Sequence, residues 1–426
     1  MDAAKRMGII VGGGPAPGIN AVIGAAAIRA LVDDVEVVGI LDGFHWIMSG
    51  DTSHVIPLTT EAVSRIHFRG GSHLRTSRAN PTSKPETLAA TVRSLMDLGI
   101  GMLVTIGGDD TAFTAMKVQE AAQGRIRVVH VPKTIDNDLD LPPHIDTFGY
   151  QTARHVGVEI VKNLMVDANT TSRWYYAVAM GRKAGHLALG IGKAAGATLT
   201  LIPEEFPDPH VPLRAVVDTL MCAYFKRLAM GRKDGVAVIA EGLALKMDPK
   251  DLAGVEGIEV DEHGHPRLAE INLAEILKRE VQRALRTEFG HKVTIVHKDI
   301  GYELRCADPI PYDMEYARDL GYCAAKYLLQ GGKGVMVSIQ GGHFVPIPFE
   351  RLVDPATGRT RVRLVDISST RYAIARRYMI RLRRDDFEPG SDLPQIAQVA
   401  GMDPTRFRDR FGYLVEWEPP ALMLPD

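Results

Sequence analysis

Short, continuous runs of apolar residues alternate along the chain with longer segments that we predict to be helical. The apolar runs at residues 7–11, 102–106 and 128–131 are typical of parallel strands that are buried on both faces. Helices are predicted after the first two of these runs, over residues 20–31 and 111–122. This alternation predicts a parallel, doubly wound α/β sheet.

Two polar stretches come directly after predicted strands: GGDD at residues 107–110 and PKTIDND at residues 132–138. Both stretches lie at the carboxyl ends of predicted parallel strands, so they place four carboxylates, a lysine and a threonine at one edge of the sheet. Ligands of open α/β sheets bind in the crevice outside this edge. Carboxylates beside glycines suit a metal ion, a phosphate and a hydroxyl group that loses its proton. The simpler interpretation is two helix-capping turns, in which Asp110 only supplies N-terminal charge. The presence of both stretches favours function.

The first predicted strand leads into a glycine-rich loop, GGGPAPG at residues 12–18, and then into a helix. This layout binds phosphate on backbone N–H groups and on the helix N-terminus. The loop is not a P-loop, because Ile19 stands where the P-loop has lysine. It is not the dinucleotide fingerprint, because Pro17 stands where that motif has its third glycine. Phosphate binding and a tight strand-to-helix turn remain as the two interpretations.

A second series of strands and helices begins after a predicted long helix over residues 149–169. Arg182 and Glu241 follow the predicted strands 174–179 and 236–240, as the acids of the first series follow theirs. We therefore expect two facing α/β domains with a substrate cleft. The expected boundaries are 1–148 for a donor domain with a return near 306–366, 149–305 for a sugar-phosphate domain, and 367–426 for a C-terminal extension.

Three further segments carry local signals. A glycine-led loop at residues 70–78 ends in Arg78, and arginine can bind phosphate oxygens bidentately. Residues 83–86, SKPE, match a capping box that would begin a helix. Residues 371–384 hold six arginines among apolar side chains, which we interpret as a solvated helix face, with a partner surface as the alternative. One helix is predicted beyond them, over residues 393–400.

The composition narrows the class of protein. The chain has 426 residues, 46% hydrophobic and 24% charged, as in an ordinary globular protein. The formal net charge of −2 gives no sign of a nucleic-acid or anionic-membrane partner. No apolar stretch is long enough to span a membrane, and the N-terminus has no apolar signal core. Three unevenly spaced cysteines predict reduced thiols in the cytoplasm.

The motifs, taken in order, resemble those of the phosphofructokinases, and among them the diphosphate-dependent type. The resemblance rests on six segments covering roughly the first three quarters of the chain: residues 12–18, 107–110, 132–138, 180–182, 241–242 and 301–305. It implies a fold of two facing α/β domains and a cytoplasmic, Mg²⁺-dependent homo-oligomer. The implied reaction is reversible phosphoryl transfer from diphosphate to the 1-hydroxyl of fructose 6-phosphate.

The resemblance also implies residue roles. Asp136 matches the general base, Asp138 the second acid, Thr134 the hydroxyl at the transferring group, and Asp109 the residue that positions Mg²⁺. Gly13 and Gly14 match the backbone at the donor, and Arg78 the arginine on the donor phosphates. Arg182 is also counted as catalytic. The segments that match the sugar-phosphate site are Thr134, Ile135 and Asp136, Met180, Gly181 and Arg182, Glu241, and Tyr302, Glu303, Leu304 and Arg305. Arg173 matches an arginine that related enzymes lend to a neighbouring subunit.

Some positions distinguish the donor. Asp110 and Lys133 stand where ATP-dependent members have glycine, which favours diphosphate as the donor. Arg75 stands where members usually have glycine, and Pro15 where many ATP-dependent members have Asp. The alternatives are an ATP-dependent kinase of the same fold and a catalytically silent regulatory subunit. The presence of both Asp136 and Asp138 disfavours the silent subunit, and the missing fingerprint disfavours a dinucleotide-binding oxidoreductase.

Overall fold

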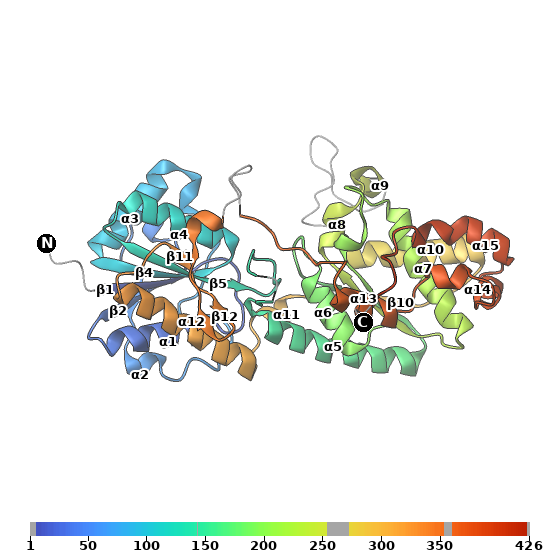
Figure 1. The fold of residues 1–426 in the computed structure, drawn as a ribbon, viewed down its shortest axis with the longest axis horizontal. Coiled ribbons are helices and arrows are strands. Elements are labelled where there is room, and N and C mark those ends of the chain that lie inside the picture. The colour runs from blue at the N-terminus through green and yellow to red at the C-terminus, as the bar shows by residue number, and fades with distance from the viewer. Residues whose placement is uncertain (1–5, 143, 254–271, 353–359, 424–426) are drawn as a thin grey trace. The chain divides into compact units, whose positions relative to one another are not determined.

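The computed structural model describes residues 6–142, 144–253, 272–352 and 360–423 (Figure 1). The chain forms two compact units, one of residues 1–153 and 302–363 and the other of residues 154–301 and 364–426. The units therefore divide at 153/154 and 301/302, against the predicted 148 and 305. Residues 302–305 consequently belong to the first unit, and the C-terminal residues belong to the second.

The first unit is built on an eight-stranded sheet. Its main order is β14-β11-β5-β4-β1-β2-β3, and β6 pairs with β5. The strands are β1 Arg6–Val11, β2 Glu36–Ile40, β3 Val55–Pro57, β4 Ile100–Gly107, β5 Arg127–Thr134, β6 Phe148–Gly149, β11 Val335–Met336 and β14 Ile347–Pro348. All of their pairings are parallel except β2 with β3 and β11 with β14. The strand order reverses between β1 and β4, and ligands of such sheets bind at this point.

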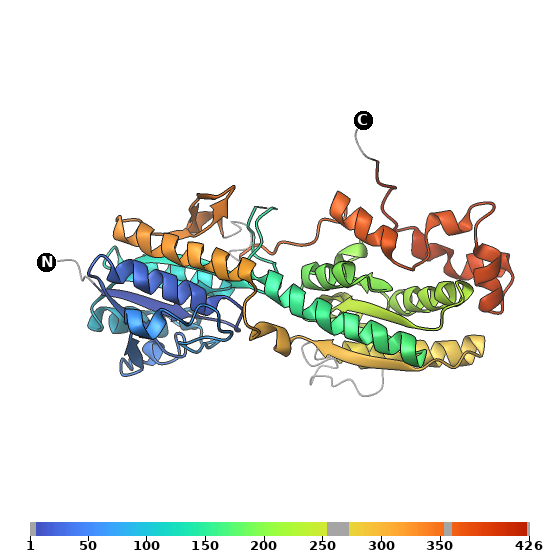
Figure 2. The ribbon, with the colours of Figure 1, turned by 90° about the horizontal axis from the view of Figure 1, so that it is seen from below.

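Helices cover both faces of this sheet, as a doubly wound fold requires. They are α1 Ile19–Leu31, α2 Thr60–Val63, α3 Pro85–Asp97, α4 Asp109–Ala122, α11 Tyr302–Arg305 and α12 Pro311–Leu329. Helices α1 and α12 lie side by side on one face and α3 and α4 lie on the other (Figures 1 and 2). Each face of the sheet has its own hydrophobic core under these helices. The successive residues Ile9 and Ile10 of β1 belong to different cores, because side chains alternate along a strand. A small hairpin, β12 Ile339–Gln340 and β13 His343–Phe344, completes the unit.

The second unit contains a four-stranded parallel sheet of order β10-β7-β9-β8. The strands are β7 Trp174–Ala179, β8 Leu199–Leu201, β9 Gly235–Ala240 and β10 Ile295–Ile300. The helices are α5 Tyr150–Thr171, which begins in the first unit, then α6 His186–Ala195, α7 Leu213–Ala229, α8 Gly242–Lys246, α9 Pro249–Ala253, α10 Leu273–Phe289, α13 Thr370–Tyr378, α14 Leu393–Val399 and α15 Pro404–Phe411. No helix in the described ranges is long and apolar enough to cross a membrane.

The C-terminal residues complete the core of the second unit. Phe407 and Phe411 of α15 are fully buried and pack against Phe225 of α7, and Phe411 also stacks on Phe289 of α10. The sequence predicted one helix in this region, and the structure has two, α14 and α15. Burial of these aromatic side chains stabilises the unit through the hydrophobic effect.

The predicted capping box at residues 83–86 is wrong. Helix α3 begins at Pro85 with Lys84 as its N-cap residue, and no side chain caps it. Ser83 instead ends a short 3-10 turn and donates its hydroxyl to the carbonyl of Asn80 at 2.9 Å. Proline at the first helical position has no N–H group that needs a cap, so the turn can use the serine.

The prediction of a solvated arginine face over residues 371–384 is only partly right: Arg371, Arg377 and Arg384 are exposed, but the segment is not one helix and two of its arginines are buried. Helix α13 ends at Tyr378, and Arg376 and Arg381 are only 7% and 5% exposed. Arg381 donates to the carboxylate of Glu205 at 2.8 Å, and Glu205 is itself 6% exposed. A buried carboxylate needs a cationic partner, and this requirement overrides the helical pattern of the sequence.

Candidate active site

The loops after β1 and β4 meet at Thr111. A Cβ atom on Gly12 would lie 2.5 Å from the Thr111 hydroxyl oxygen, and one on Gly107 would lie 2.3 Å from it. Any side chain at either glycine would therefore push the two loops apart. The structure thus explains both glycines by close approach and brings the glycine-rich loop beside the Asp109–Asp110 turn.

The loop at residues 70–78 runs along the glycine-rich loop. The N–H of Gly13 donates to the carbonyl of Ser77 at 2.8 Å, and the Thr76 hydroxyl donates to the carbonyl of Gly13 at 2.6 Å. Arg78 comes directly after this contact and is exposed. Arg75 has a φ of 56°, in the left-handed region that favours glycine, which is the residue expected at this position. Its guanidinium lies 3.6 Å from Asp42.

Two cationic side chains reach Gly13 and Gly14. The ammonium group of Lys133 donates to the carbonyl of Gly14, and Lys133 is only 4% exposed. The guanidinium of Arg305 lies 3.2 Å from the position that a Cβ atom on Gly14 would take, and it also lies over the ring of Tyr302 at 4.8 Å. Two cations beside a glycine backbone form an environment suited to a phosphate.

The loop after β5 carries the two predicted acids in a defined conformation. Asp136 and Asp138 are 6% and 7% exposed, and Asn137 between them has a φ of 56°. Asparagine tolerates this left-handed conformation better than most residues. The N–H of Asp136 donates to the Thr134 hydroxyl at 3.0 Å, and the N–H of Thr147 donates to the Asn137 side-chain oxygen at 3.0 Å. The acids are thus held on a turn that side chains brace from within.

His130 is a buried residue of β5 that the sequence analysis missed. Its Nδ1 atom lies 2.9 Å from the Thr105 hydroxyl and its Nε2 atom 3.0 Å from the carbonyl of Gly107. A carbonyl only accepts, so Nε2 carries the proton and Nδ1 accepts from Thr105. Burial lowers the pKa of His130 to about 3, so the ring is neutral and fixes the turn before Asp109. A histidine within an apolar run gives no sequence signal of such a role.

The two acids at the start of α4 differ in exposure. Asp109 is half-buried and Asp110 is exposed, and both lie in the first helical turn, where negative charge is favourable. Across the described residues no group of three or more His, Cys, Asp or Glu side chains is placed to hold a metal ion. Mg²⁺ is commonly bound by one or two carboxylates together with substrate phosphates, so Asp109 fits binding of this kind.

In the second unit, the loops after β7 and β9 are joined by Glu241. Its Oε2 atom accepts from the N–H groups of Gly181 at 3.1 Å and Arg182 at 3.3 Å. A Cβ atom on Gly242 would lie 2.5 Å from the carbonyl of Arg182, so glycine is needed there. The loop after β10 joins them, because the N–H of Met180 donates to the carbonyl of Ile300 at 3.0 Å. Glu241 therefore shapes the Met180–Arg182 loop and does not cap α8 with its side chain.

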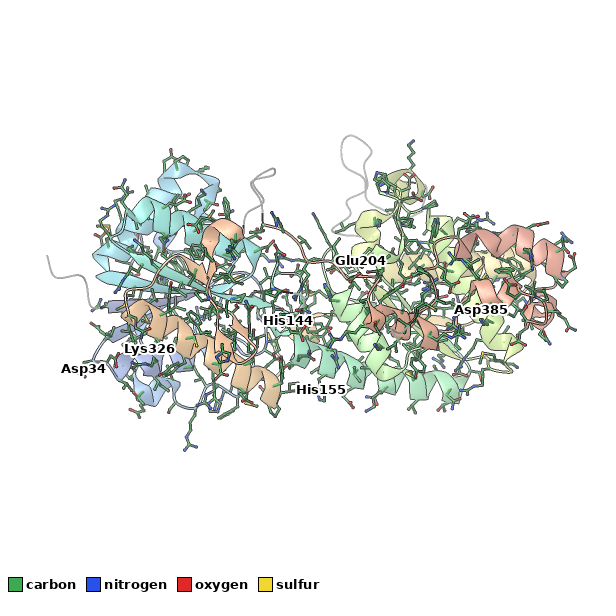
Figure 3. All side chains as sticks on the ribbon, viewed as in Figure 1. Asp34, His144, His155, Glu204, Lys326 and Asp385 are labelled. Atoms are coloured by element: carbon green, nitrogen blue, oxygen red, sulfur yellow. The ribbon has the colours of Figure 1, made fainter. Side chains whose placement is uncertain are left out.

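A second acid supports the same region. Glu204, labelled in Figure 3, accepts from the N–H of Gly185 at 2.9 Å and from the N–H of Val365 at 3.0 Å. Burial raises the pKa of its carboxyl group. Glu204 thus links the end of the loop after β7 to the C-terminal part of the chain.

The side chains of three predicted site residues do not join these groups. The side chains of Ile135 and Leu304 are buried, at 4% and 0% exposure, so a ligand could meet only their backbone. Arg173 precedes β7 and lies 3.9 Å from Asp167, whereas Met180 follows β7, about 20 Å away along the strand. Arg173 therefore does not contact this chain's own Met180–Arg182 loop.

Comparisons with known proteins agree on one family. The sequence profile of the family described as Phosphofructokinase matches residues 6–328. The chain is 54% identical over 418 residues to a pyrophosphate–fructose 6-phosphate 1-phosphotransferase of Thermotoga maritima, covering 97% of this chain and 99% of the relative. It is 49% identical to one of Naegleria fowleri, covering 96% of each.

A solved structure shares the fold at low sequence identity. It is a pyrophosphate-dependent phosphofructokinase from Nitrosospira multiformis, with a TM-score of 0.68, 17% identity, and coverage of 88% of this chain and 91% of that one. The profile match and the two relatives show the family, and the structural likeness supports the expected two-domain α/β fold. This chain belongs to the phosphofructokinase family.

Proposed function

We propose that this protein is a diphosphate-dependent 6-phosphofructokinase. It transfers a phosphoryl group from diphosphate to the 1-hydroxyl of fructose 6-phosphate, giving fructose 1,6-bisphosphate and phosphate, and it catalyses the reverse reaction as well. The observation that carries this conclusion is 54% identity, over nearly the whole of both chains, to a relative that is named for this reaction. The loops of the first unit supply the kinds of group that phosphoryl transfer needs.

We assign the proton transfer to Asp136. Its carboxylate accepts the proton of the 1-hydroxyl while that oxygen attacks the terminal phosphorus of diphosphate. The bridging P–O bond breaks, and its electron pair leaves with the phosphate product. Burial of Asp136 and Asp138 and the hydrogen bond from the Asp136 N–H to Thr134 support this assignment, because they fix the turn that carries both acids.

The diphosphate is assigned to the glycine-rich loop and its cations. Gly13 and Gly14 bring the loop backbone to the phosphate, with the N–H of Gly14 as the proposed donor because that of Gly13 already donates to Ser77. Lys133 and Arg78 supply positive charge for the phosphate oxygens. We propose that Asp109 holds Mg²⁺, which neutralises oxygen charge on the diphosphate when it is bound. Lys133 is not a solvated turn residue, since it is buried and donates to the carbonyl of Gly14.

The sugar phosphate is assigned to Met180, Gly181, Arg182, Glu241, Tyr302 and Arg305. The Met180–Arg182 loop supports this assignment because Glu241 holds it in one conformation. The position of Arg305 against Gly14 gives it a second possible partner, the donor phosphate. We also propose a homo-oligomer in which Arg173 serves a neighbouring subunit, and a cytoplasmic location, which the free cysteines support.

A donor assay tests the proposal. The purified protein is given fructose 6-phosphate and Mg²⁺ with diphosphate, with ATP, or with neither donor, and the bisphosphate product is measured. We expect strong turnover with diphosphate and little or none with ATP. Turnover with ATP alone would establish the ATP-dependent alternative, and no turnover with either donor would establish a catalytically silent chain.

A further inference from the structure

Arg363 is bound to the loop that carries the proposed catalytic acids. Its Nε and Nη2 atoms donate to the carbonyl of Asn137 at 3.1 and 3.0 Å, and Nη2 also donates to the Asn137 side-chain oxygen. Its Nη1 atom donates to the carbonyl of Ile145 at 2.7 Å, of Pro142 at 3.2 Å and of Leu141 at 3.4 Å. One guanidinium therefore fastens both ends of the loop after Asp136.

The backbone around Arg363 adds to this connection. The N–H of Arg363 donates to the carbonyl of Asp138 at 2.8 Å, and Val362 and Leu139 form an antiparallel bridge. Residues 362–363 thus run antiparallel to Asp138 and Leu139, the second acid and the residue after it.

Asn137 is the central point of this arrangement. It lies between Asp136 and Asp138 and holds a left-handed backbone conformation, with a φ of 56°. Its side-chain oxygen accepts from both Thr147 and Arg363, and its side-chain nitrogen donates to Asp146 at 2.9 Å. A rotation of the peptide at Asn137 would turn the two neighbouring carboxylates, so the partners of Asn137 set their directions.

Charge favours Arg363 in this place. Burial lowers the pKa of the guanidinium, and the carboxylates of Asp146, Asp138 and Asp140 act in the opposite sense. A guanidinium remains charged even so, because its pKa starts far above the physiological range. Its planar donors can bind several carbonyl oxygens at once, which an ammonium group cannot do in the same geometry.

We propose that Arg363 is a positioning residue for phosphoryl transfer, which holds Asp136 and Asp138 in their reactive orientation through Asn137. The inference rests on the proposed function, since it takes Asp136 as the base. Arg363 lies outside residues 6–328, the part of the chain that the family profile matches. Displacement of a catalytic group by about 1 Å can cost about 10²-fold in rate, so loss of this connection acts mainly on kcat.

The test compares three variants with the wild type in the diphosphate assay. Arg363→Ala should lower kcat by about 10–100-fold while KM for diphosphate stays within about threefold. The kcat of Arg363→Lys should lie between that of Arg363→Ala and that of the wild type. Arg361→Ala is the matched control, because Arg361 is exposed, two residues away and equally charged, and it should leave kcat and KM unchanged. Added guanidinium ion at low millimolar concentration should raise the kcat of Arg363→Ala and not that of Arg361→Ala.

Amide hydrogen exchange supplies a readout that does not depend on activity. Exchange of the peptide covering residues 134–147 should become faster in Arg363→Ala and Arg363→Lys, and exchange in the second unit should not change. A kcat of Arg363→Lys equal to the wild type, or a fall in activity that only follows the folded fraction, would overturn the inference. If Arg363→Ala does not fold, Arg363→Lys decides the question alone. Asp136→Asn is measured in parallel: full activity there would overturn the proposed base, whereas an inactive Asp136→Asn together with a wild-type kcat for Arg363→Lys would overturn only the role of Arg363.

Discussion

The Nε2 atom of His130 donates a hydrogen bond to the carbonyl oxygen of Gly107, 3.0 Å away, in the fully buried interior of the first unit. This contact ties the end of β4 to the strand beside it, while the acceptance of a hydrogen bond from the Thr105 hydroxyl by Nδ1 requires a neutral ring. The glycine turn that precedes Asp109 is therefore held by a histidine whose ring is kept neutral by burial.

We expect this histidine to make the protein sensitive to acid. The pKa of His130 is about 3 in the folded protein and about 6.5 in the unfolded chain, so between these values the unfolded chain binds the extra proton. The free energy of unfolding is therefore unaffected by this histidine above about pH 6.5 and decreases as the pH falls below that value. The expected loss is about 1.4 kcal/mol per pH unit, or about 2 kcal/mol between pH 6.5 and 5.

Urea unfolding at pH 7, 6 and 5 checks this prediction. His130→Gln keeps a donor for Gly107 and cannot take up the proton, so its free energy of unfolding should depend less on pH than that of the wild type. Equal pH slopes for the two proteins would show that His130 does not control the acid response.

The second prediction concerns the proposed base. Asp136→Asn should retain the fold and most substrate binding but lose about 10²–10⁴-fold in kcat, because an amide cannot accept the proton of the 1-hydroxyl. Asp140→Asn is the matched control, since Asp140 is exposed on the same loop. Steady-state kinetics of both variants decide the assignment. A kcat for Asp136→Asn within a few-fold of the wild type would exclude Asp136 as the base.

The third prediction concerns the buried ion pair of the second unit. Arg381→Met should destabilise the protein by about 3 kcal/mol, because it removes the 2.8 Å partner of the buried Glu205 carboxylate and leaves only Arg376, 3.8 Å away. Arg377→Met is the control, as Arg377 is 67% exposed and pairs with the exposed Asp385. It should cost at most about 1 kcal/mol. If urea unfolding gave the same loss of unfolding free energy for both variants, the buried pair would contribute no more to stability than the exposed one.

The doubly wound α/β architecture could be predicted because parallel strands that are buried on both faces have continuous apolar sequences. Strand β7 was predicted at its observed bounds, and β1, β4 and β5 within a few residues. The site motifs could be predicted in the same way, because each is a short stretch directly after a strand. Grouping at the sheet edge then follows from the topology alone.

What the sequence could not predict depends on partners that are distant in the chain. Arg381 looks like a surface residue until Glu205, 176 positions earlier, is placed beside it. Arg363 meets Asn137 across 226 positions, and His130 meets Gly107 through a strand pairing. Such partners are fixed by tertiary packing, so no local pattern signals them.

The last prediction concerns the exclusion of ATP by Asp110. The side chain is exposed in the first turn of α4, next to Asp109, and Gly108 is the N-cap residue, so Asp110 is not the cap. We expect its bulk and negative charge to oppose the α-phosphate of a nucleotide, whereas diphosphate ends before that point. Asp110→Gly should therefore gain measurable ATP activity, and Asp110→Asn, which keeps the shape and loses the charge, should gain less. Either change should cost at most about 1–2 kcal/mol of stability through the helix terminus. The measurement is kcat/KM with ATP and with diphosphate for all three proteins. If the ratio of the two values in Asp110→Gly equals that of the wild type, then Asp110 serves only its helix, and the choice of donor must come from Lys133 or from residues outside this turn.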